Sequence, residues 1–257
     1  MNLFVAVIFL LIVFISSGTA EQNIPSDKST LIEQKLFGKN NVKKRIKYIS
    51  KNGTFGSESQ ILSIECFDKN GRIILDSNFA DDSEFGTKYT KYEYDRNGDI
   101  KRIIYYGISD KAIVHTCIYD NNDKLVQRKI EYGDIEHIEY SYDSTGLLLQ
   151  ETHYSKANSE KIKQIEYLYN SAGLISKVLQ IKFDKNKNGS GSLELEINNF
   201  YNSDTLVKST AVYPEFDISN TVKFVYSDSG LLEKVIPIDS EGKEMKRFTI
   251  FFQYEFR

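Results

Sequence analysis

The segment YSYDSTGLLLQETHYS, residues 140–155, contains a pattern of aromatic, turn and aliphatic residues that recurs along most of the chain. Tyr140 and Tyr142 lie two residues apart, as on one face of a strand. Asp143 and Gly146 then bracket a short turn, and Leu148 begins a second apolar stretch. The segment therefore predicts a hairpin of two antiparallel strands.

The same pattern occurs seven times. Its central aromatic residue, called position 0, falls at Phe67, Tyr94, Tyr119, Tyr142, Tyr169, Tyr201 and Tyr226, at spacings of 23 to 32 residues. Position +1 is Asp or Asn in six copies, position +4 is Gly in five, and position +6 is aliphatic in all seven. A period of this size is typical of stacked-repeat folds. A partial copy near Tyr48 and an unfinished one at Phe252 flank the series.

Seven hairpins predict an all-β fold of tandem antiparallel β-hairpin repeats in one long sheet. Twisted open sheets rarely exceed about ten strands without curling. We therefore expect a coiled or curled sheet, in the form of an open shell, a spiral or a partial barrel. The predicted organisation is a signal peptide at 1–20, an N-terminal cap or tether with a short helix-compatible stretch at 21–40, and the repeat domain at 41–257.

The first residues are typical of export. An unbroken apolar run occupies residues 3–15, and Gly18 and Ala20 stand where a signal peptidase reads small residues. The run is shorter than the about 20 residues that a membrane-spanning helix needs. We expect cleavage after Ala20, an uncleaved anchor being the alternative. The mature chain should then have no integral membrane span and be periplasmic, exposed at the cell surface or extracellular.

The composition and motifs argue against several functions. The net charge is −3, and Lys and Glu alternate along the chain without a basic stripe, which disfavours nucleic-acid binding. No nucleophile motif, phosphate loop or zinc spacing is present. His115, His137 and His153 fall at different offsets from position 0, so we expect solvent-facing or partly buried histidines, with His137 in a connector. The sequence predicts no catalytic, cofactor-binding or metal residues, no cofactor and no enzymatic activity.

One connector resembles a calcium loop. Asp184, Asn186, Asn188 and Gly189 form the D-x-N-x-N-G opening of such a loop. The twelfth position, where a closing carboxylate belongs, is Leu195, with Glu194 and Glu196 on either side. We favour a flexible hairpin insertion and keep calcium binding as the alternative.

The two cysteines should not form a disulfide. Cys66 stands at position −1 and Cys117 at position −2, which point to opposite faces of a strand. They are also two units apart, or roughly 19 Å at 4.8 Å per strand. A disulfide needs Cα atoms within about 7 Å.

The faces of the sheet change along the chain. The aromatic residues at position −2, Tyr92, Tyr140, Tyr167 and Phe224, form a ladder that we expect to be core, a sugar-stacking surface being the alternative. Position +5 runs Arg72, Asp99, Lys124, Leu147, Leu174, Leu206 and Leu231, and position −1 drifts from Cys66, Glu93, Ile118 and Ser141 to Leu168, Phe200 and Val225. The pattern therefore predicts apolar residues on both faces of the sheet in the later units and on one face in the early units. Either the chain covers its own second face there, or that face is an interface with a partner or a second copy.

A rival architecture is an outer-membrane barrel, which needs an apolar outward row in every strand. Charges at Arg72, Asp99, Lys124 and Glu93 interrupt such a row. We therefore expect a soluble repeat domain and keep the membrane barrel as the alternative.

The pattern Tyr94-Asp95…Gly98…Ile100 and Tyr142-Asp143…Gly146…Leu148 resembles the YD repeat of the Rhs family, which also occurs in teneurins and insecticidal toxin complexes. The resemblance covers residues 65–239 and is greater to short, stand-alone YD-repeat proteins of bacterial envelopes. It implies a hollow β-shell with carbohydrate or protein contacts. This chain has too few repeats to enclose a cargo, and the turns at Asp123, Thr205 and Ser227 depart from the pattern.

These observations predict an exported binding or scaffolding module for a carbohydrate or a protein, with homo-oligomerisation left open. The alternatives are a component of a larger Rhs-like shell or toxin assembly, an envelope enzyme, or a calcium-dependent module.

Overall fold

The computed structural model describes residues 28–50, 54–56, 59–79, 89–107, 111–183 and 190–257, so the predicted signal peptide lies outside the described part. The described residues contain one α-helix, α2 (Lys28–Lys39), before the first strand. The strands are β1 (Val42–Ile49), β2 (Gln60–Phe67), β3 (Ile73–Asn78), β4 (Tyr89–Tyr94), β5 (Ile100–Tyr106), β6 (Ile113–Tyr119), β7 (Leu125–Ile130), β8 (Ile135–Tyr142), β9 (Leu148–Ser155), β10 (Lys161–Tyr169), β11 (Ile175–Phe183), β12 (Gly191–Asn202), β13 (Thr205–Tyr213), β14 (Ile218–Tyr226), β15 (Leu232–Ile238) and β16 (Ile250–Phe256). Two 3₁₀ turns, η2 (Pro214–Phe216) and η3 (Lys246–Phe248), lie in connectors.

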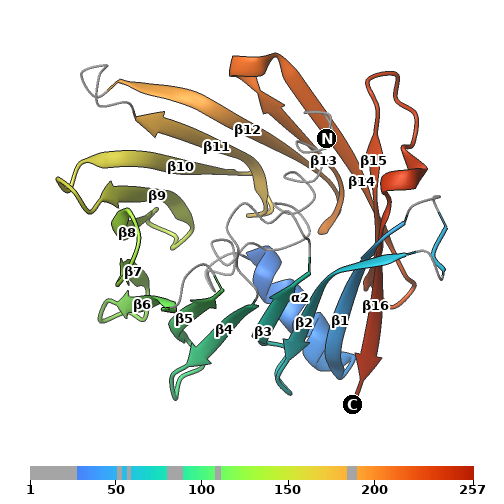
Figure 1. Ribbon diagram of the computed structural model, residues 1–257, viewed down its shortest axis with the longest axis horizontal. Helices are drawn as coiled ribbons and strands as arrows, with labels where there is room; N and C mark the ends of the chain where they lie inside the picture. The colour runs from blue at the N-terminus through green and yellow to red at the C-terminus, as the bar shows by residue number, and fades with distance from the viewer. Residues whose placement is uncertain (1–27, 51–53, 57–58, 80–88, 108–110, 184–189) are drawn as a thin grey trace.

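The strands form a closed antiparallel barrel in which each strand pairs with its neighbours in the sequence (Figure 1). The seven predicted hairpins are the pairs from β2–β3 to β14–β15, so the prediction of an all-β hairpin sheet is confirmed. The expected open shell or spiral is wrong, because β1 pairs with both β2 and β16. These two strands come from the partial copies at the ends of the series. Their pairing removes both free edges of the sheet.

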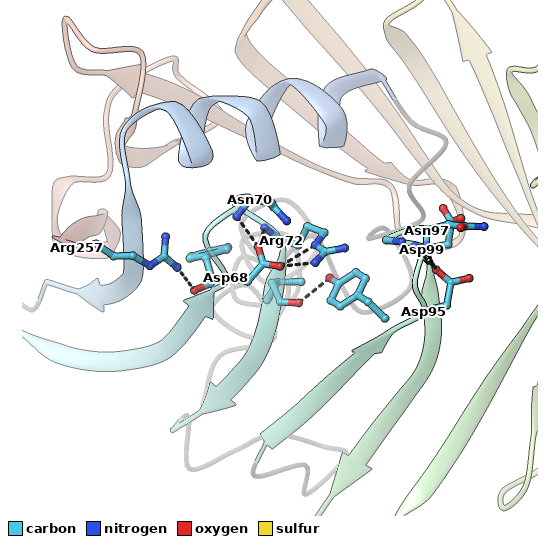
Figure 2. A network of polar contacts seen from close by, with 11 residues as sticks. Asp68, Asn70, Arg72, Asp95, Asn97, Asp99 and Arg257 are labelled. Carbon is cyan, nitrogen blue, oxygen red and sulfur yellow. Dashed lines mark hydrogen bonds and ion pairs between the residues drawn. The ribbon is translucent and has the colours of Figure 1, made fainter.

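The repeat forms turns as predicted. In the first unit, Oδ1 of Asp68 accepts hydrogen bonds from the backbone N–H groups of Asn70 and Arg72. Asp95 does the same for Asn97, Gly98 and Asp99 in the next turn (Figure 2). Position +4 is left-handed in six units, with φ of 95° at Gly98 and 58° at Asp123, where Gly is replaced. In the Tyr201 unit the turn is shorter: Thr205 pairs with Asn202, and Ser203 is the left-handed residue, with φ 54°.

A turn of the same kind also occurs outside the seven units, where the repeat pattern did not predict it. Asp239 accepts hydrogen bonds from the backbone N–H groups of Glu241 and Lys243, and Gly242 has φ 84°. It belongs to the connector between β15 and β16, at the opposite end of the barrel from the seven repeat turns. The same Asp-x-x-Gly pattern therefore marks turns at both ends.

A tyrosine at position 0 joins most of the hairpins to the hairpin before them. Tyr142 donates a hydrogen bond from its hydroxyl to the backbone C=O of Leu125, the position +6 residue of the preceding unit, at 2.8 Å. The same contact recurs from Tyr94 to Ile73, Tyr119 to Ile100, Tyr169 to Leu148, Tyr201 to Ile175 and Tyr254 to Leu232. This ladder explains why a hydroxyl as well as a ring recurs at position 0.

The aromatic ladder at position −2 faces the interior and is core, as expected. Tyr92, Tyr140, Tyr167 and Phe224 are all buried. Position −1 faces outward, and its later residues Leu168 and Phe200 remain 45% and 46% exposed. The outer surface between them carries ion pairs such as Lys91–Glu93 and Lys177–Glu196. Among the described residues, no helix is long and apolar enough to cross a membrane.

Position +5 does not lie on the outward face. Arg72 places its guanidinium 4.6 Å from the ring centre of Tyr94, and Lys124 lies 5.4 Å from that of Tyr142, the next unit in each case. Leu174 and Leu231 at the same position are buried. Position +5 therefore connects adjacent turns within the chain, which supports intramolecular covering for these leucines.

The cysteines lie on opposite surfaces of the wall, as predicted. Cys66 pairs with Lys44 on the outward row, and Cys117 pairs with Arg128 on the inward row. Both thiols are free. Burial raises the pKa of Cys117 to about 11.

Helix α2 packs against the repeat turns on both sides of β1 and β16. A Cβ added to Gly71, in the β2–β3 turn, would lie 2.1 Å from the backbone oxygen of Gln34. Leu36 approaches Gly230 in the β14–β15 turn. Phe37 is buried against Phe67 and Tyr254. The helix thus covers the place where the barrel closes, and Figure 2 shows it passing over the first turn.

Candidate functional site: the charged inner wall

The inner wall carries buried charges that the repeat pattern did not predict. Among them, Arg45 and Lys47 on β1 and Glu65 on β2 are each at most 5% exposed. Oε2 of Glu65 accepts a hydrogen bond from Arg45, with which it forms an ion pair. Its Oε1 lies 2.7 Å from the Lys47 ammonium. Glu33 of α2 pairs with Arg45 at 2.6 Å. The cluster therefore ties the helix to the barrel.

Aromatic rings enclose the guanidinium of Arg45. It lies 5.0 Å from the ring centre of Phe37, 5.7 Å from that of Phe252 and 5.8 Å from that of Phe67. Such contacts are favourable for a desolvated cation. Burial alone would raise the pKa of Glu65, but the charges of Arg45 and Lys47 outweigh it and hold that pKa below its usual value.

Asp76 on β3 is a buried acid of this cluster that lies next to another acid, Glu65. It pairs in register with Glu65, and its Oδ1 is buried without a hydrogen-bond partner among the described residues. Burial first, and the charge of Glu65 second, raise the pKa of Asp76 to about 6. A charged Asp76 at neutral pH therefore destabilises the folded protein.

Asp76→Asn should raise the free energy of unfolding at pH 8 by about 1–3 kcal/mol, since one pKa unit corresponds to about 1.4 kcal/mol. The folded carboxyl binds its proton at a higher pH than the unfolded one. Its contribution therefore favours folding at low pH and is lost as the pH rises toward 6. Urea denaturation from pH 4 to pH 8 should show the gain of the variant shrinking toward pH 4. Asp228→Asn, at an exposed turn, is the control, and a pH-independent gain at Asp76 would contradict the assignment.

A second inward group lies on β9 and β10. Glu151 and His153 are both 0% exposed. Glu151 accepts a hydrogen bond from the hydroxyl of Tyr167, and its Oε2 lies 3.8 Å from Nε2 of His153. That oxygen and both ring nitrogens of His153 have no hydrogen-bond partner among the described residues. Each buried polar atom of this kind lowers the stability of the folded protein by about 1–3 kcal/mol unless it forms a hydrogen bond.

The histidines differ from expectation in two respects. His137 lies in β8, stacked on Tyr154 at 4.6 Å, and is not in a connector. His153 is fully buried rather than solvent-facing, because period-2 alternation in β9 places it inward with Glu151. His115, on β6, faces the interior of the barrel and packs against the ring of Tyr105. In the described ranges, no three His, Cys, Asp or Glu side chains gather as a metal site.

The calcium-like connector is only partly visible, because residues 184–189 lie outside the described part. Both carboxylates near its closing position belong to β12 and have other partners. Glu196 pairs with Lys177 at 2.8 Å, and Glu194 accepts a hydrogen bond from Gln180 at 2.7 Å. Leu195, at the twelfth position, is buried.

Comparisons with known proteins identify the architecture. No family model and no curated protein matches the chain. A porin-like protein from Bacteroides uniformis shares 10% identity at a TM-score of 0.50, covering 83% of this chain and 98% of that one. A porin-like protein from Bacteroides vulgatus shares 14% at 0.46 with the same coverage.

A complex titled TcdB2-TccC3-Cdc42 also matches, with 13% identity and a TM-score of 0.37 over 74% of this chain. The chain spans about a tenth of the toxin chains that it matches. At these identities the likeness concerns the fold alone. The chain is similar to porin-like barrels in architecture.

Proposed function

We propose that the protein is an exported, water-facing barrel that binds a ligand inside its wall and catalyses no reaction. The observation that carries this proposal is the buried pair Glu151 and His153. Oε2 of Glu151 and both ring nitrogens of His153 have no hydrogen-bond partner among the described residues. Native proteins rarely leave such atoms without a hydrogen bond, and where the protein supplies no partner a ligand or an ordered water usually does. A pair of inward, desolvated groups on adjacent positions is therefore suited to recognition.

The size of the barrel supports an interior site. A closed barrel of sixteen strands is wider than the side chains of its own wall can fill, whereas eight strands leave just enough room for them. Helix α2 approaches the β2–β3 turn at Gly71 and the β14–β15 turn at Gly230. The outer surface carries hydrogen-bonded and ionic pairs along its strands, such as Gln164–Glu166 and Lys177–Glu196, as a surface in water does.

The two cysteines allow the location of a ligand to be tested. We would screen the purified protein on a glycan array and by thermal shift with a metabolite library. A ligand found there should slow alkylation of Cys117, which pairs with Arg128 inside the wall, and leave Cys66 on the outer row unchanged. Without ligand, Cys117 should already react more slowly than Cys66, since burial raises its pKa. Mass spectrometry measures both rates, and unfolding in guanidinium should remove the difference.

Matched variants separate the two surfaces. Glu151→Gln keeps the size of the inward side chain and should weaken binding, whereas Glu139→Gln, outward on β8, should not. A ligand that protects Cys66 instead, or that depends on Glu139, would refute the interior site. A pull-down that captures a protein through Leu168 and Phe200 would point to the second candidate, a scaffold in a larger assembly, because these outward residues are exposed.

A further inference from the structure

One register row of the inner wall carries basic side chains on four strands. Arg128 on β7 pairs with Ile138, which pairs with His153 on β9. His153 pairs with Lys163 on β10, and Lys163 pairs with Lys182 on β11. Residues paired directly across strands share a face. Ile138 and His153 are 0% exposed, which places this face inside.

In the part of the chain that the structure describes, this row contains no carboxylate. Its other members are Cys117, Ile138 and Ser192. Glu151, on the adjacent row, accepts a hydrogen bond from the Tyr167 hydroxyl, and Glu194, on β12, accepts one from the Gln180 amide. Basic side chains are therefore concentrated on this row, although the whole chain has a net charge of −3.

His153 supplies an independent indication of a ligand. Its imidazole is fully buried in the middle of the row, and neither nitrogen has a hydrogen-bond partner among the described residues. A protonated or neutral imidazole between Arg128 and Lys163 would donate to an oxyanion. Hydrogen bonds from cationic donors to an oxyanion are among the strongest in proteins.

We infer that the row Arg128, His153, Lys163 and Lys182 holds the anionic group of the interior ligand, a carboxylate, sulfate or phosphate. This inference rests on the proposed interior binding function and names its ligand class. The acceptor Glu151 beside the row would orient hydroxyl groups of the same ligand, since its Oε2 has no hydrogen-bond partner among the described residues. Tyr140 and Tyr167 flank Glu151 on this wall.

The test compares two lysines of one strand. Lys182 is exposed at the inward end of β11, so Lys182→Gln should fold normally, and Lys177 lies outward on the same strand in its pair with Glu196. Isothermal titration calorimetry would measure the affinity of the protein for galacturonate, inorganic sulfate and inorganic phosphate, with neutral galactose as the comparison. We expect at least one anion to bind, about tenfold more weakly in Lys182→Gln and unchanged in Lys177→Gln. Lys163→Gln should repeat the loss, and binding should weaken with added salt.

The outcomes distinguish the inference from the proposed function. Galactose binding as well as galacturonate, with no change in Lys182→Gln, would overturn the anionic class while Cys117 protection still supports an interior site. Anion binding that Lys177→Gln abolishes would move the site outside and overturn the inference. If no compound from the array, the library or the anion series protects Cys117, the proposed function fails and the inference with it. Binding of one anion that selectively protects Cys117 and depends on Lys182 and Lys163 would support both.

Discussion

Glu65→Ala should lower the free energy of unfolding by about 3–5 kcal/mol, because it leaves Arg45 and Lys47 as buried charges without their shared partner. Both cations lie inside the barrel and are at most 5% exposed. In the variant Arg45 keeps its contact with Glu33 of α2, whereas the Lys47 ammonium loses the carboxylate that lies 2.7 Å from it. Equilibrium denaturation in guanidinium at pH 7 measures the loss.

The control is the pair of Lys44, on the outward face of β1, with Glu255 of β16. Glu255→Ala removes the partner of Lys44 from an exposed pair, and its effect should be close to the limit of measurement. Glu65 also has a lowered pKa, so its stabilisation is present above its usual value near 4.5 and is lost as the pH falls through that range. Glu65→Ala should remove this part of the acid sensitivity. Equal losses in the two variants would show that the cluster is not buried as the structure has it.

The hairpins could be predicted because their determinants are local. An Asp at position +1 and a Gly at position +4 specify a turn whose hydrogen bonds close within five residues, as at Asp95 and Gly98. The alternation of strand residues then places Tyr92 and Tyr140 inside without further information. The opposite facing of Cys66 and Cys117 follows from the same alternation.

Closure of the barrel could not be predicted in this way. It depends on β1 and β16, which stand more than 200 residues apart in the chain and pair over the range from Val42 to Ile49. The sequence VKKRIKYI has four basic residues in eight, and alternation alone does not say that Arg45 and Lys47 turn inward. Their partner Glu65 lies on the next strand, so the polar interior emerges only when the strands are paired.

The candidate site was missed for the same reason. His153 looked like an ordinary strand residue at a scattered offset, and position +5 looked like part of a second face of the sheet. Period-2 alternation from the inward Leu148 would place Gln150 and Thr152 inside, but a β-bulge between Leu148 and Gln150 shifts the count by one. Glu151 and His153 therefore face inward. The +5 residues precede that bulge and reach sideways to the next turn, as Arg72 does to Tyr94.

Gly71→Ala should lower the free energy of unfolding by about 2–5 kcal/mol, because both the left-handed backbone and a neighbouring backbone atom disfavour the added methyl group. Gly71 has φ 78°, which costs an L-residue about 1–2 kcal/mol. Its Cβ would also lie 2.1 Å from the backbone oxygen of Gln34 and 2.7 Å from the backbone nitrogen of Gly38, so α2 must move. Overpacking of this kind adds about 1–3 kcal/mol.

Gly173→Ala is the matched control for the conformational cost. Gly173 occupies position +4 of another unit with φ 74°, and nothing lies within 4 Å of its added Cβ. Its loss in guanidinium denaturation should be only the about 1–2 kcal/mol of the left-handed backbone. The difference between the variants then measures the packing of α2 on the first turn, and Gly71→Ala alone should speed proteolytic cleavage within residues 28–39. Equal losses, with no change in proteolysis, would show that the helix does not hold the closing strands of the barrel in place.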